Sequence, residues 1–425
     1  MVALILGVFI VGYAAIAFEH NIKINKAATS LITGVLCWSI YALYSMDKDL
    51  PVHQLTEHLG EVAGILFFLM GAMTVVELID AHDGFEIITG HITTTSKKKL
   101  VWIVAFISFF LSAVLDNLTT TIVMVSLLRN LVQERRERLL FIGLVVIAAN
   151  SGGAWSPIGD VTTTMLWLGG QIDAQAIVSH VIVPSLVCCA VPAFIISLQV
   201  KGTLKRTDVS LTRNGLAGPR SRLVVFLLGV GTLMFVPIFK IITNLPPYMG
   251  ILFGLGGMWL ITELIHSEKD EAEKGLLSVN HALRKIDTPS ILFFLGILLS
   301  VAVLQTTGVL AELAVWLDNN LGNIEAITFS IGALSSIVDN VPLVAAAQGM
   351  YSLQQFPTDH TFWMMLAYCA GTGGSMLIIG SAAGVAAMGM EKIDFFWYLK
   401  RVGWLALLGY AAGMAVYLLQ QYLLA

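Results

Sequence analysis

Long apolar segments dominate this chain and limit the folds that are open to it. Of its 425 residues, 57% are hydrophobic and only 12% are charged, whereas a soluble domain carries about 25% charged residues. A helix needs roughly 20 apolar residues to cross a bilayer. Ten runs are close to that length or longer: 2–19, 27–45, 57–80, 139–170, 176–199, 222–241, 247–266, 289–308, 361–390 and 401–424. We therefore expect an all-α polytopic membrane protein.

The composition also excludes several classes of protein. The formal net charge of −4 argues against nucleic acid as a partner, because nucleic-acid-binding domains present a basic surface. The cysteines lie in apolar runs without metal-ligand spacing, and we expect them to pack as small apolar side chains; they are Cys37, Cys188, Cys189 and Cys369. No basic segment or cleavage site marks the first apolar run as a signal peptide, so we expect it to be the first span.

Two further apolar stretches, 100–133 and 324–350, each contain an aspartate within a polar motif. Residues 112–121 read SAVLDNLTTT, and residues 335–340 read SSIVDN, 223 positions later (335 − 112). A charged side chain in the hydrocarbon core is costly, so an intramembrane aspartate indicates a functional site. Two such motifs at matching places indicate a transporter built from a repeat, with its binding site near the midplane.

The charges that flank these two stretches predict re-entrant hairpins. The stretch 100–133 lies between basic clusters at 97–99 and 135–138, and such clusters mark the cytoplasmic side of a membrane. We expect it to form two half-length helices that enter from the cytoplasm and turn at 116–120. The stretch 324–350 has acidic flanks, so we expect it to enter from outside. Its predicted tip is 339–342, because Pro342 breaks a helix.

The spans and hairpins divide into two halves of five spans and one hairpin each. Residues 1–200 and 222–425 form these halves, and the basic linker 201–221 is expected in the cytoplasm. Because five is odd, the second half is predicted to be inverted, with both termini outside. Short matches support this repeat: ILFFLM at 65–70 resembles ILFFLG at 291–296, and the glycines at 152, 153 and 159 recur 221 positions later.

Two of the long spans contain residues that interrupt helices. The span 139–170 includes ANSGGAWSPIGDVTTT at 149–164, and the span 361–390 includes AGTGGSMLIIGSAAG at 370–384. In a helix interior glycine costs about 1 kcal/mol and proline about 3 kcal/mol. We therefore expect both spans to break at mid-membrane, where unwound carbonyl groups can bind a cation.

The polar residues of the hairpin tips and the helix interruptions form one candidate site. Carboxylate, amide and hydroxyl oxygens suit a hard cation such as Na⁺, and the absence of Lys and Arg from the set disfavours an anion. The candidate cation- and proton-binding residues are Asp116, Asn117, Thr119, Thr120, Asn150, Ser151, Ser156, Asp160, Thr162, Thr163, Ser335, Ser336, Asp339, Asn340, Thr372 and Ser375.

A buried carboxyl group can exchange a proton for Na⁺, because burial favours its neutral form. As a hypothesis, Asp116 and Asp160 are the titrating ligands, and Asp339 is the partner of Asp116 in the second half. The alternative is that these aspartates only cap helices. Three titratable residues toward the cytoplasmic end of the third span are either an entrance or pH-sensing element or a solvated helix end: Glu77, Asp80 and His82.

The motifs VLDNLTTT, NSGGAWSPIGDVTTT, SSIVDNVP and GTGGS resemble those of the NhaD-type Na⁺/H⁺ antiporters of the ion-transporter superfamily. The resemblance covers nearly the whole chain. It implies an inverted repeat with two re-entrant hairpins and two discontinuous helices. It also implies export of Na⁺, with Li⁺ as a second candidate, against proton entry at alkaline pH.

The resemblance also implies which residues act. By position, the polar membrane residues of the family match Asp116, Asn150, Asp160, Thr162, Thr163, Ser335 and Asn340. We expect Na⁺ to be held by Asp116, Asn150, Asp160 and Asn340. The second half departs from the family because Ser375 is followed by Met376 and Leu377, where related members carry hydroxyl residues.

Other functions stay open from the sequence. An anion carrier of the same superfamily, for a carboxylate, arsenite or sulfate, would present amides and hydroxyls rather than aspartates at its hairpin tips. A two-aspartate intramembrane protease needs a carboxylate dyad, and its YD and GxGD contexts are missing. A passive channel would not explain an inverted repeat.

We expect neither enzyme activity nor a cofactor. The expected partners are membrane lipid and the transported ions, and a homodimer stays open. The lack of a transit peptide favours a bacterial inner membrane.

Overall fold

The structure is a computed structural model that describes residues 1–17, 19–89, 92, 94–200, 202–203, 218–268 and 270–424. All regular elements in these ranges are helices, apart from one isolated backbone bridge between Ser96 and Thr203. The predicted all-α polytopic fold is therefore confirmed. Most of the predicted linker 201–221 lies outside the described residues.

The helices follow one another along the whole chain. The first half contains α1 (Val2–Ala17), α2 (Glu19–Ile22), α3 (Lys26–Tyr44), α4 (Asp49–Ala81), α5 (Glu86–Thr89), α6 (Lys97–Leu115), α7 (Asn117–Leu131), α8 (Arg135–Gly153), α9 (Val161–Leu168) and α10 (Ala174–Gln199). The second half contains α11 (Pro219–Thr243), α12 (Pro247–Ile265), α13 (Glu271–Leu276), α14 (Val279–Lys285), α15 (Thr288–Thr306), α16 (Val309–Leu321), α17 (Ile324–Leu334), α18 (Asn340–Met350), α19 (Thr361–Gly373), α20 (Ala382–Glu391), α21 (Phe395–Tyr398), the π-helical turn η1 (Leu399–Gly403) and α22 (Trp404–Leu424).

Within the described ranges, eight helical segments are long and apolar enough to cross a membrane. They are α3, α4, α6, α10, α11, α12, α15 and the segment that runs from α21 into α22. All of them except α6 coincide with predicted spans, and the first predicted span is the shorter apolar helix α1. The helix α16, between the predicted eighth span and the second hairpin, is not among the predicted elements.

Both hairpins break close to their predicted tips, with two corrections. The helices α6 and α7 meet at Asp116, but α6 has 19 residues and could cross a membrane alone, so it is longer than the half-length helix predicted. In the second hairpin α17 ends at Leu334 and α18 begins at Asn340. Pro342 therefore lies in the first turn of α18 and not at the tip. The first turn tolerates proline because its N–H groups have no partner within the helix.

Both predicted helix interruptions are confirmed, between α8 and α9 and between α19 and α20. Glycine allows each interrupted helix to approach the hairpin of its own half. A methyl group at Gly152 would overlap the carbonyl oxygen of Phe109 in α6, and one at Gly373 would overlap the carbonyl oxygen of Gly332 in α17. The two halves therefore use the same close contact to position a hairpin against an interrupted helix.

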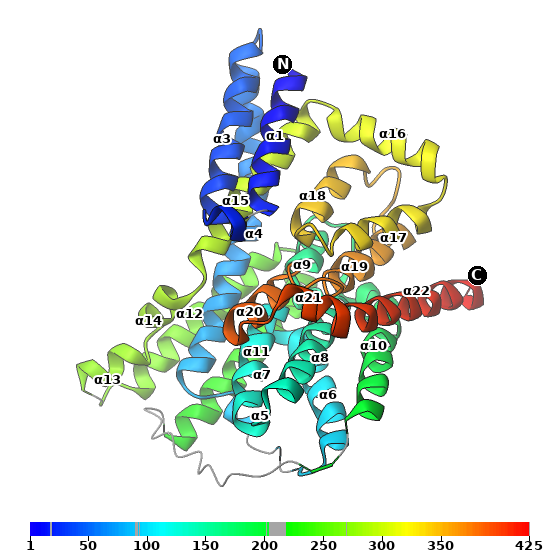
Figure 1. Cartoon of the computed structure of the whole chain (residues 1–425). Coiled ribbons are helices and arrows are strands. Elements are labelled where there is room, and N and C mark those ends of the chain that lie inside the picture. Colours follow the sequence, from blue (N-terminus) through cyan, green and yellow to red (C-terminus); the bar gives the residue numbers. More distant parts are fainter. Residues whose placement is uncertain are drawn as a thin grey trace.

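Helices from the two halves pack against each other. The helix α3 packs on α15, α4 on α12, and α10 on α22. Each hairpin also contacts the interrupted helix of the other half, through α7 with α20 and α18 with α9. In Figure 1, α9, α19 and α20 gather in the middle of the molecule, below the paired α1 and α3. The inverted orientation of the second half stays a prediction.

Candidate functional site

Asp160 lies at the start of α9, with only 2% of its surface exposed. Its Oδ1 accepts hydrogen bonds from the backbone N–H (2.9 Å) and the hydroxyl (2.7 Å) of Thr162, so it caps the helix. Its Oδ2 accepts a hydrogen bond from Asn117 Nδ2 (2.7 Å), and Asn340 Nδ2 donates to Oδ1 at 3.4 Å. Because Asn117 begins α7 and Asn340 begins α18, Asp160 joins the tips of both hairpins.

A series of amide groups continues from Asp160 into the second half. Asn117 Nδ2 also donates to Asn150 Oδ1 (3.0 Å). Asn150 Nδ2 donates to Ser375 Oγ (2.9 Å) and Ser381 Oγ (2.8 Å). Asn150 belongs to α8, and the two serines lie in the interruption between α19 and α20. This side chain therefore links the interrupted helices of the two halves.

Asp116 separates α6 from α7 and caps the start of α7. Thr119 donates to it twice, from its backbone N–H to Oδ1 (2.7 Å) and from its hydroxyl to Oδ2 (3.0 Å). The φ angle of Asp116 is +104°, which L-residues rarely adopt, so the hairpin tip is strained. Asp116, Asn117 and Asp160 line one cavity of about 60 Å³. A cavity of this size has room for a cation with a small number of water molecules.

Asp339, at the tip of the second hairpin, has a different environment. It caps α18 by accepting a hydrogen bond from the backbone N–H of Val341 (3.2 Å). Lys26 Nζ lies 3.4 Å from Asp339 Oδ2 and 4.4 Å from the centre of the Phe293 ring. The expectation that no Lys or Arg belongs to the polar set is therefore wrong at this tip, because α3 brings the ammonium group of Lys26 to it.

Most of the predicted hydroxyl ligands donate to backbone carbonyl groups. Ser335 in the second hairpin donates to the carbonyl oxygen of Ala370 (2.9 Å), as Ser112 in the first does to that of Ala149 (2.6 Å). Four further hydroxyls donate to carbonyls three or four residues earlier: those of Ser151, Thr163, Ser336 and Thr372. Ser156 donates to the carbonyl oxygen of Ala113, whereas the buried Thr120 hydroxyl has no partner among the described residues.

Two residues of the network lie outside the predicted set. Ser381 binds Asn150 and also caps α20 by accepting a hydrogen bond from the backbone N–H of Gly384 (3.2 Å). It follows Asp160 by 221 positions (381 − 160), the offset that relates the glycines of the two halves, so the repeat could have identified it. No sequence pattern could have identified Lys26 as a neighbour of Asp339, because the two residues are 313 positions apart.

A second cavity, of about 550 Å³, approaches the first hairpin between α4 and α7. Its lining contains Glu77 and Asp80, and it extends to Thr119 beside Asp116. Glu77 pairs with Lys285 Nζ at 3.2 Å. His82 does not line this cavity. It is buried against His266, with the Nε2 atoms of the two rings 2.9 Å apart. The entrance or pH-sensing role of these residues stays a prediction.

A cation at Asp160 would need the Asn117 and Asn340 amides to turn, because their Nδ2 atoms rather than their oxygen atoms face the carboxylate. In the described part of the chain, no three His, Cys, Asp or Glu side chains are placed to hold a metal ion together. A cation at Asp160 would meet one carboxylate, with the amides of Asn117, Asn150 and Asn340 close by. Asp116 lines the same cavity. The proposed Na⁺ ligands are thus adjacent to one another, and their role as ligands stays a prediction.

A buried carboxylate where two hairpins and two interrupted helices meet is typical of a secondary transporter. The chain belongs to the family described as "Citrate transporter", which matches residues 13–366. The predicted resemblance to NhaD-type antiporters is confirmed by individual relatives. The proteins named below are transporters, so the chain is a membrane transporter and not an enzyme.

Three relatives illustrate the similarity. Sodium/proton antiporter 1 of Arabidopsis thaliana is 52% identical over 412 residues, covering 96% of this chain and 71% of the relative. The Na⁺/H⁺ antiporter NhaD of Alkalimonas amylolytica is 30% identical over 452 residues, covering 97% of this chain and 89% of the relative. The Na⁺/H⁺ antiporter NhaD of Vibrio parahaemolyticus is 32% identical over 424 residues, covering 91% of this chain and 98% of the relative.

Proposed function

We propose that this chain exchanges Na⁺ for H⁺ across its membrane. The relatives named as sodium/proton antiporters support this function, since they align with nearly the whole chain. The observation that carries the proposal is the environment of Asp160. This buried carboxylate accepts hydrogen bonds from amide and hydroxyl groups, but no Lys or Arg pairs with it among the described residues. A carboxylate in a membrane interior needs a proton or a cation to offset its charge.

In the proposed mechanism Asp160 holds H⁺ and Na⁺ in turn. The amide N–H groups of Asn117 and Asn340 and the Thr162 hydroxyl donate to the Asp160 oxygens, and such donors favour the ionised carboxylate, so they would help Na⁺ to displace the proton. Na⁺ binds oxygen ligands, so its binding would release the proton to the side from which Na⁺ entered and would turn the amide oxygens toward the ion. Asp116 lines the same cavity, and two ionised carboxylates there would repel each other. That repulsion favours a proton on one of them whenever Na⁺ is absent.

The cavity of about 550 Å³ would supply ions to this site. Its lining combines five acidic residues, Glu77, Asp80, Asp83, Glu86 and Asp287, with the basic residues Arg222 and Lys285. A cleft with an excess of negative charge raises the local concentration of cations. Because the cavity extends to Thr119, whose hydroxyl binds Asp116, it leads to the first hairpin tip. We assign it as the cytoplasmic entrance.

Further details belong to the same proposal. Li⁺ would be a second cargo, because it is also a hard cation with a preference for oxygen ligands. The relatives come from a plant and from bacteria, so the bacterial inner membrane rests on the sequence argument alone. The homodimer likewise stays a prediction.

The proposal can be tested in everted membrane vesicles at alkaline pH. A pH-sensitive dye reports the proton gradient, and Na⁺, Li⁺ and K⁺ are added in turn to vesicles with the wild type or Asp116→Asn. We expect Na⁺ to dissipate the gradient with the wild type and to have little effect with the variant.

Citrate provides the competing outcome, because the family description names citrate. If Na⁺ leaves the gradient unchanged with the wild type but labelled citrate accumulates, the chain is an anion carrier and the exchange proposal is wrong.

A further inference from the structure

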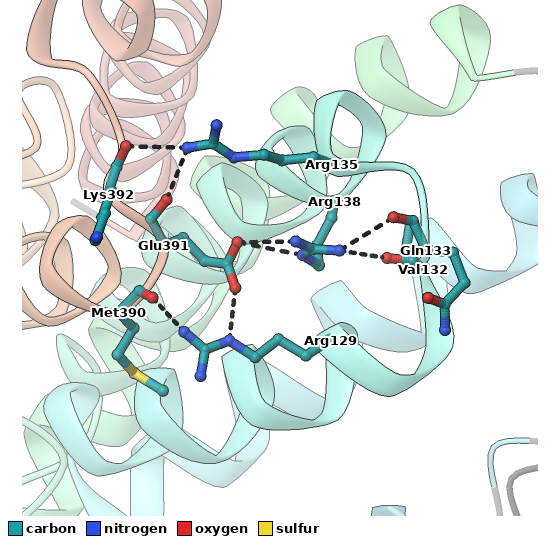
Figure 2. A network of polar contacts seen from close by, with 8 residues as sticks. All are labelled: Arg129, Val132, Gln133, Arg135, Arg138, Met390, Glu391 and Lys392. Atoms are coloured by element: carbon teal, nitrogen blue, oxygen red, sulfur yellow. Dashed lines mark hydrogen bonds and ion pairs between the residues drawn. The ribbon is translucent and has the colours of Figure 1, made fainter.

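Several basic side chains gather where four helix ends meet. The helix α7 ends at Leu131 and α8 begins at Arg135, while α20 ends at Glu391 and α21 begins at Phe395. Figure 2 shows that side chains from the first pair of ends reach the second pair. Because clusters of Lys and Arg mark the cytoplasmic side of a membrane, we expect this basic face in the cytoplasm.

Glu391 is the acidic residue at the centre of this region, and two arginines neutralise its charge. Its side chain is 5% exposed. Arg129 Nε donates to Oε1 (2.6 Å), and the Nε and Nη2 atoms of Arg138 both donate to Oε2 (3.2 Å). Arg129 also donates to the carbonyl oxygen of Met390. Two arginines therefore share one carboxylate, and no negative charge is left over for other cations.

Four further cations remain beside this network. Among the described residues, Arg135 donates to the carbonyl oxygens of Glu391 (3.2 Å) and Lys392 (3.3 Å) and pairs with no carboxylate. Arg136, Lys392 and Arg401 are exposed and have no ion-pair partner in the described part of the chain. In Figure 2 the ammonium group of Lys392 points away from Glu391. These side chains carry positive charge that the protein itself does not neutralise.

The four cations line a single cavity. It has a volume of about 530 Å³, and its lining includes Arg135, Arg136, Lys392, Arg401, Asp394 and Trp397. Asp394 is its one acidic residue, and its carboxylate is engaged in capping α21 at the backbone N–H of Trp397 (2.8 Å). The volume lies within the range of small-molecule sites, roughly 300–1,000 Å³. An anion is the ligand that this charge balance favours.

The surroundings of the cavity favour an anion that is attached to lipid. Trp397 belongs to a helical segment long and apolar enough to span a membrane, and tryptophan is enriched at the level of lipid headgroups. Its neighbour Phe396 is 65% exposed, and Leu399 and Trp404 on the same segment are also exposed. Arg401 lies in the π-helical turn η1, a feature often found at functional sites. An apolar, lipid-facing surface therefore begins beside the basic cavity.

We infer that this cavity binds the phosphate-bearing headgroup of an anionic phospholipid from the cytoplasmic leaflet. Basic pockets between membrane helices on this side bind such headgroups by charge. The two phosphate oxygens that carry the negative charge would lie among Arg136, Lys392 and Arg401. The acyl chains would follow the exposed apolar side chains of α21 and α22.

Binding can be measured by native mass spectrometry of the purified full-length chain. Dioleoylphosphatidylglycerol and dioleoylphosphatidylcholine are titrated against the wild type and the variant Arg136→Gln/Lys392→Gln/Arg401→Gln. The matched control is Lys98→Gln/Lys99→Gln/Lys400→Gln, which removes the same charge from exposed residues outside the cavity. Each basic residue strengthens attraction to an anionic surface about fivefold, so loss of three should weaken phosphatidylglycerol binding about 100-fold.

The expected result is a preference for phosphatidylglycerol in the wild type and the control, and loss of that preference in the cavity variant. Equal losses in the two triple variants would overturn the inference, because they would indicate general attraction to the membrane surface. Glycerol 3-phosphate is added as a soluble probe. If it binds as tightly as the lipid, the site takes a free phosphate compound and the lipid assignment is wrong.

A second measurement uses the wild type alone, in case the triple variant does not fold. Phosphatidylglycerol with a photoactivatable headgroup is incorporated into phosphatidylcholine vesicles that contain the protein. Cross-links should map to residues 392–401 and to the start of α8. Cross-links spread evenly over the cytoplasmic basic residues would contradict the inference.

Discussion

Lys26 Nζ lies 3.4 Å from Asp339 Oδ2, and this ion pair distinguishes the two hairpin tips. At the first tip the Asp116 carboxylate accepts hydrogen bonds from the backbone N–H and the hydroxyl of Thr119. Asp160 beside it is bonded only to hydroxyl, amide and backbone groups among the described residues. The carboxylate of the second tip thus has a Lys partner, whereas no Lys or Arg among the described residues pairs with Asp116 or Asp160. In the proposed mechanism a proton or a cation offsets the charge at the first tip, so we expect the two halves to differ in function although they share the Asp-Asn motif.

The first prediction is that Lys26→Gln and Asp339→Asn are not additive. Each single change leaves one charged group without its partner, whereas the double variant removes both. Because the side chains are only 27% and 20% exposed, we expect a coupling in the upper part of the range for ion pairs near a surface, about 0.5–1 kcal/mol in the free energy of unfolding. The apparent Na⁺ affinity of the double variant should also be closer to the wild type than that of Lys26→Gln. Effects that add within about 0.3 kcal/mol would show that the pair is not coupled.

The second prediction concerns Asn150, whose amide links the two interrupted helices. Asn150→Ala removes hydrogen bonds to Ser375 and Ser381 and leaves Asn117 with one partner fewer. We expect a loss of about 1–3 kcal/mol of stability, because buried polar groups lose their partners, together with loss of transport. Thermal unfolding in detergent and vesicle assays measure the two effects. Ser197→Ala is the control, since that hydroxyl binds only the carbonyl oxygen of Phe194 in its own helix. Equal stability of the two variants would contradict the linking role.

The third prediction uses the matched glycines of the two halves. Alanine at Gly152 or Gly373 places a methyl group against a backbone carbonyl oxygen that cannot move without the hairpin. We expect each change to cost about 1–3 kcal/mol. Gly231 in α11 has no neighbouring atom within 4 Å of an added methyl group, so Gly231→Ala should instead stabilise the chain by about 0.5–1 kcal/mol. A neutral Gly373→Ala would mean that the second hairpin does not approach α19 closely.

The fourth prediction compares two ion pairs on the basic face. Glu391→Gln leaves Arg129 and Arg138 beside each other without a carboxylate. Glu391 is buried, but Arg129 and Arg138 are 44% and 16% exposed, so we expect a loss of about 1–3 kcal/mol, below the about 3–5 kcal/mol of a fully buried pair. Glu137→Gln is the control, because the Glu137 side chain is 23% exposed against 5% for Glu391, and its pair with Lys97 should be worth no more than about 1 kcal/mol. Chemical or thermal unfolding compares the two variants, and similar losses would show that burial does not set the difference.

The sequence predicts the site best where a residue does not suit the segment around it, such as a charged residue in an apolar run or a helix breaker in a helix. Asp116 stands in an apolar run, and Gly152 with Pro157 stands in a helical one, so the first hairpin tip and the first interruption could be predicted. Contacts between distant segments could not. Lys26 and Asp339 are 313 positions apart, and they meet because α3 packs against α15, which in turn packs against α18 of the second hairpin. The length of α6 could not be predicted either. The flanking charges indicate where the hairpin enters and leaves the membrane, but they do not indicate how deep in the membrane the chain turns.

The most direct test of the account is whether Na⁺ and H⁺ compete at Asp160. Purified protein in weakly buffered detergent solution is mixed with NaCl at alkaline pH, and a pH indicator records released protons, with choline chloride as the salt control. We predict that Na⁺ releases protons from the wild type, and that Asp160→Asn abolishes or strongly reduces the release while the variant stays folded. Undiminished release from folded Asp160→Asn would contradict the account, because the exchanged proton would then be held elsewhere.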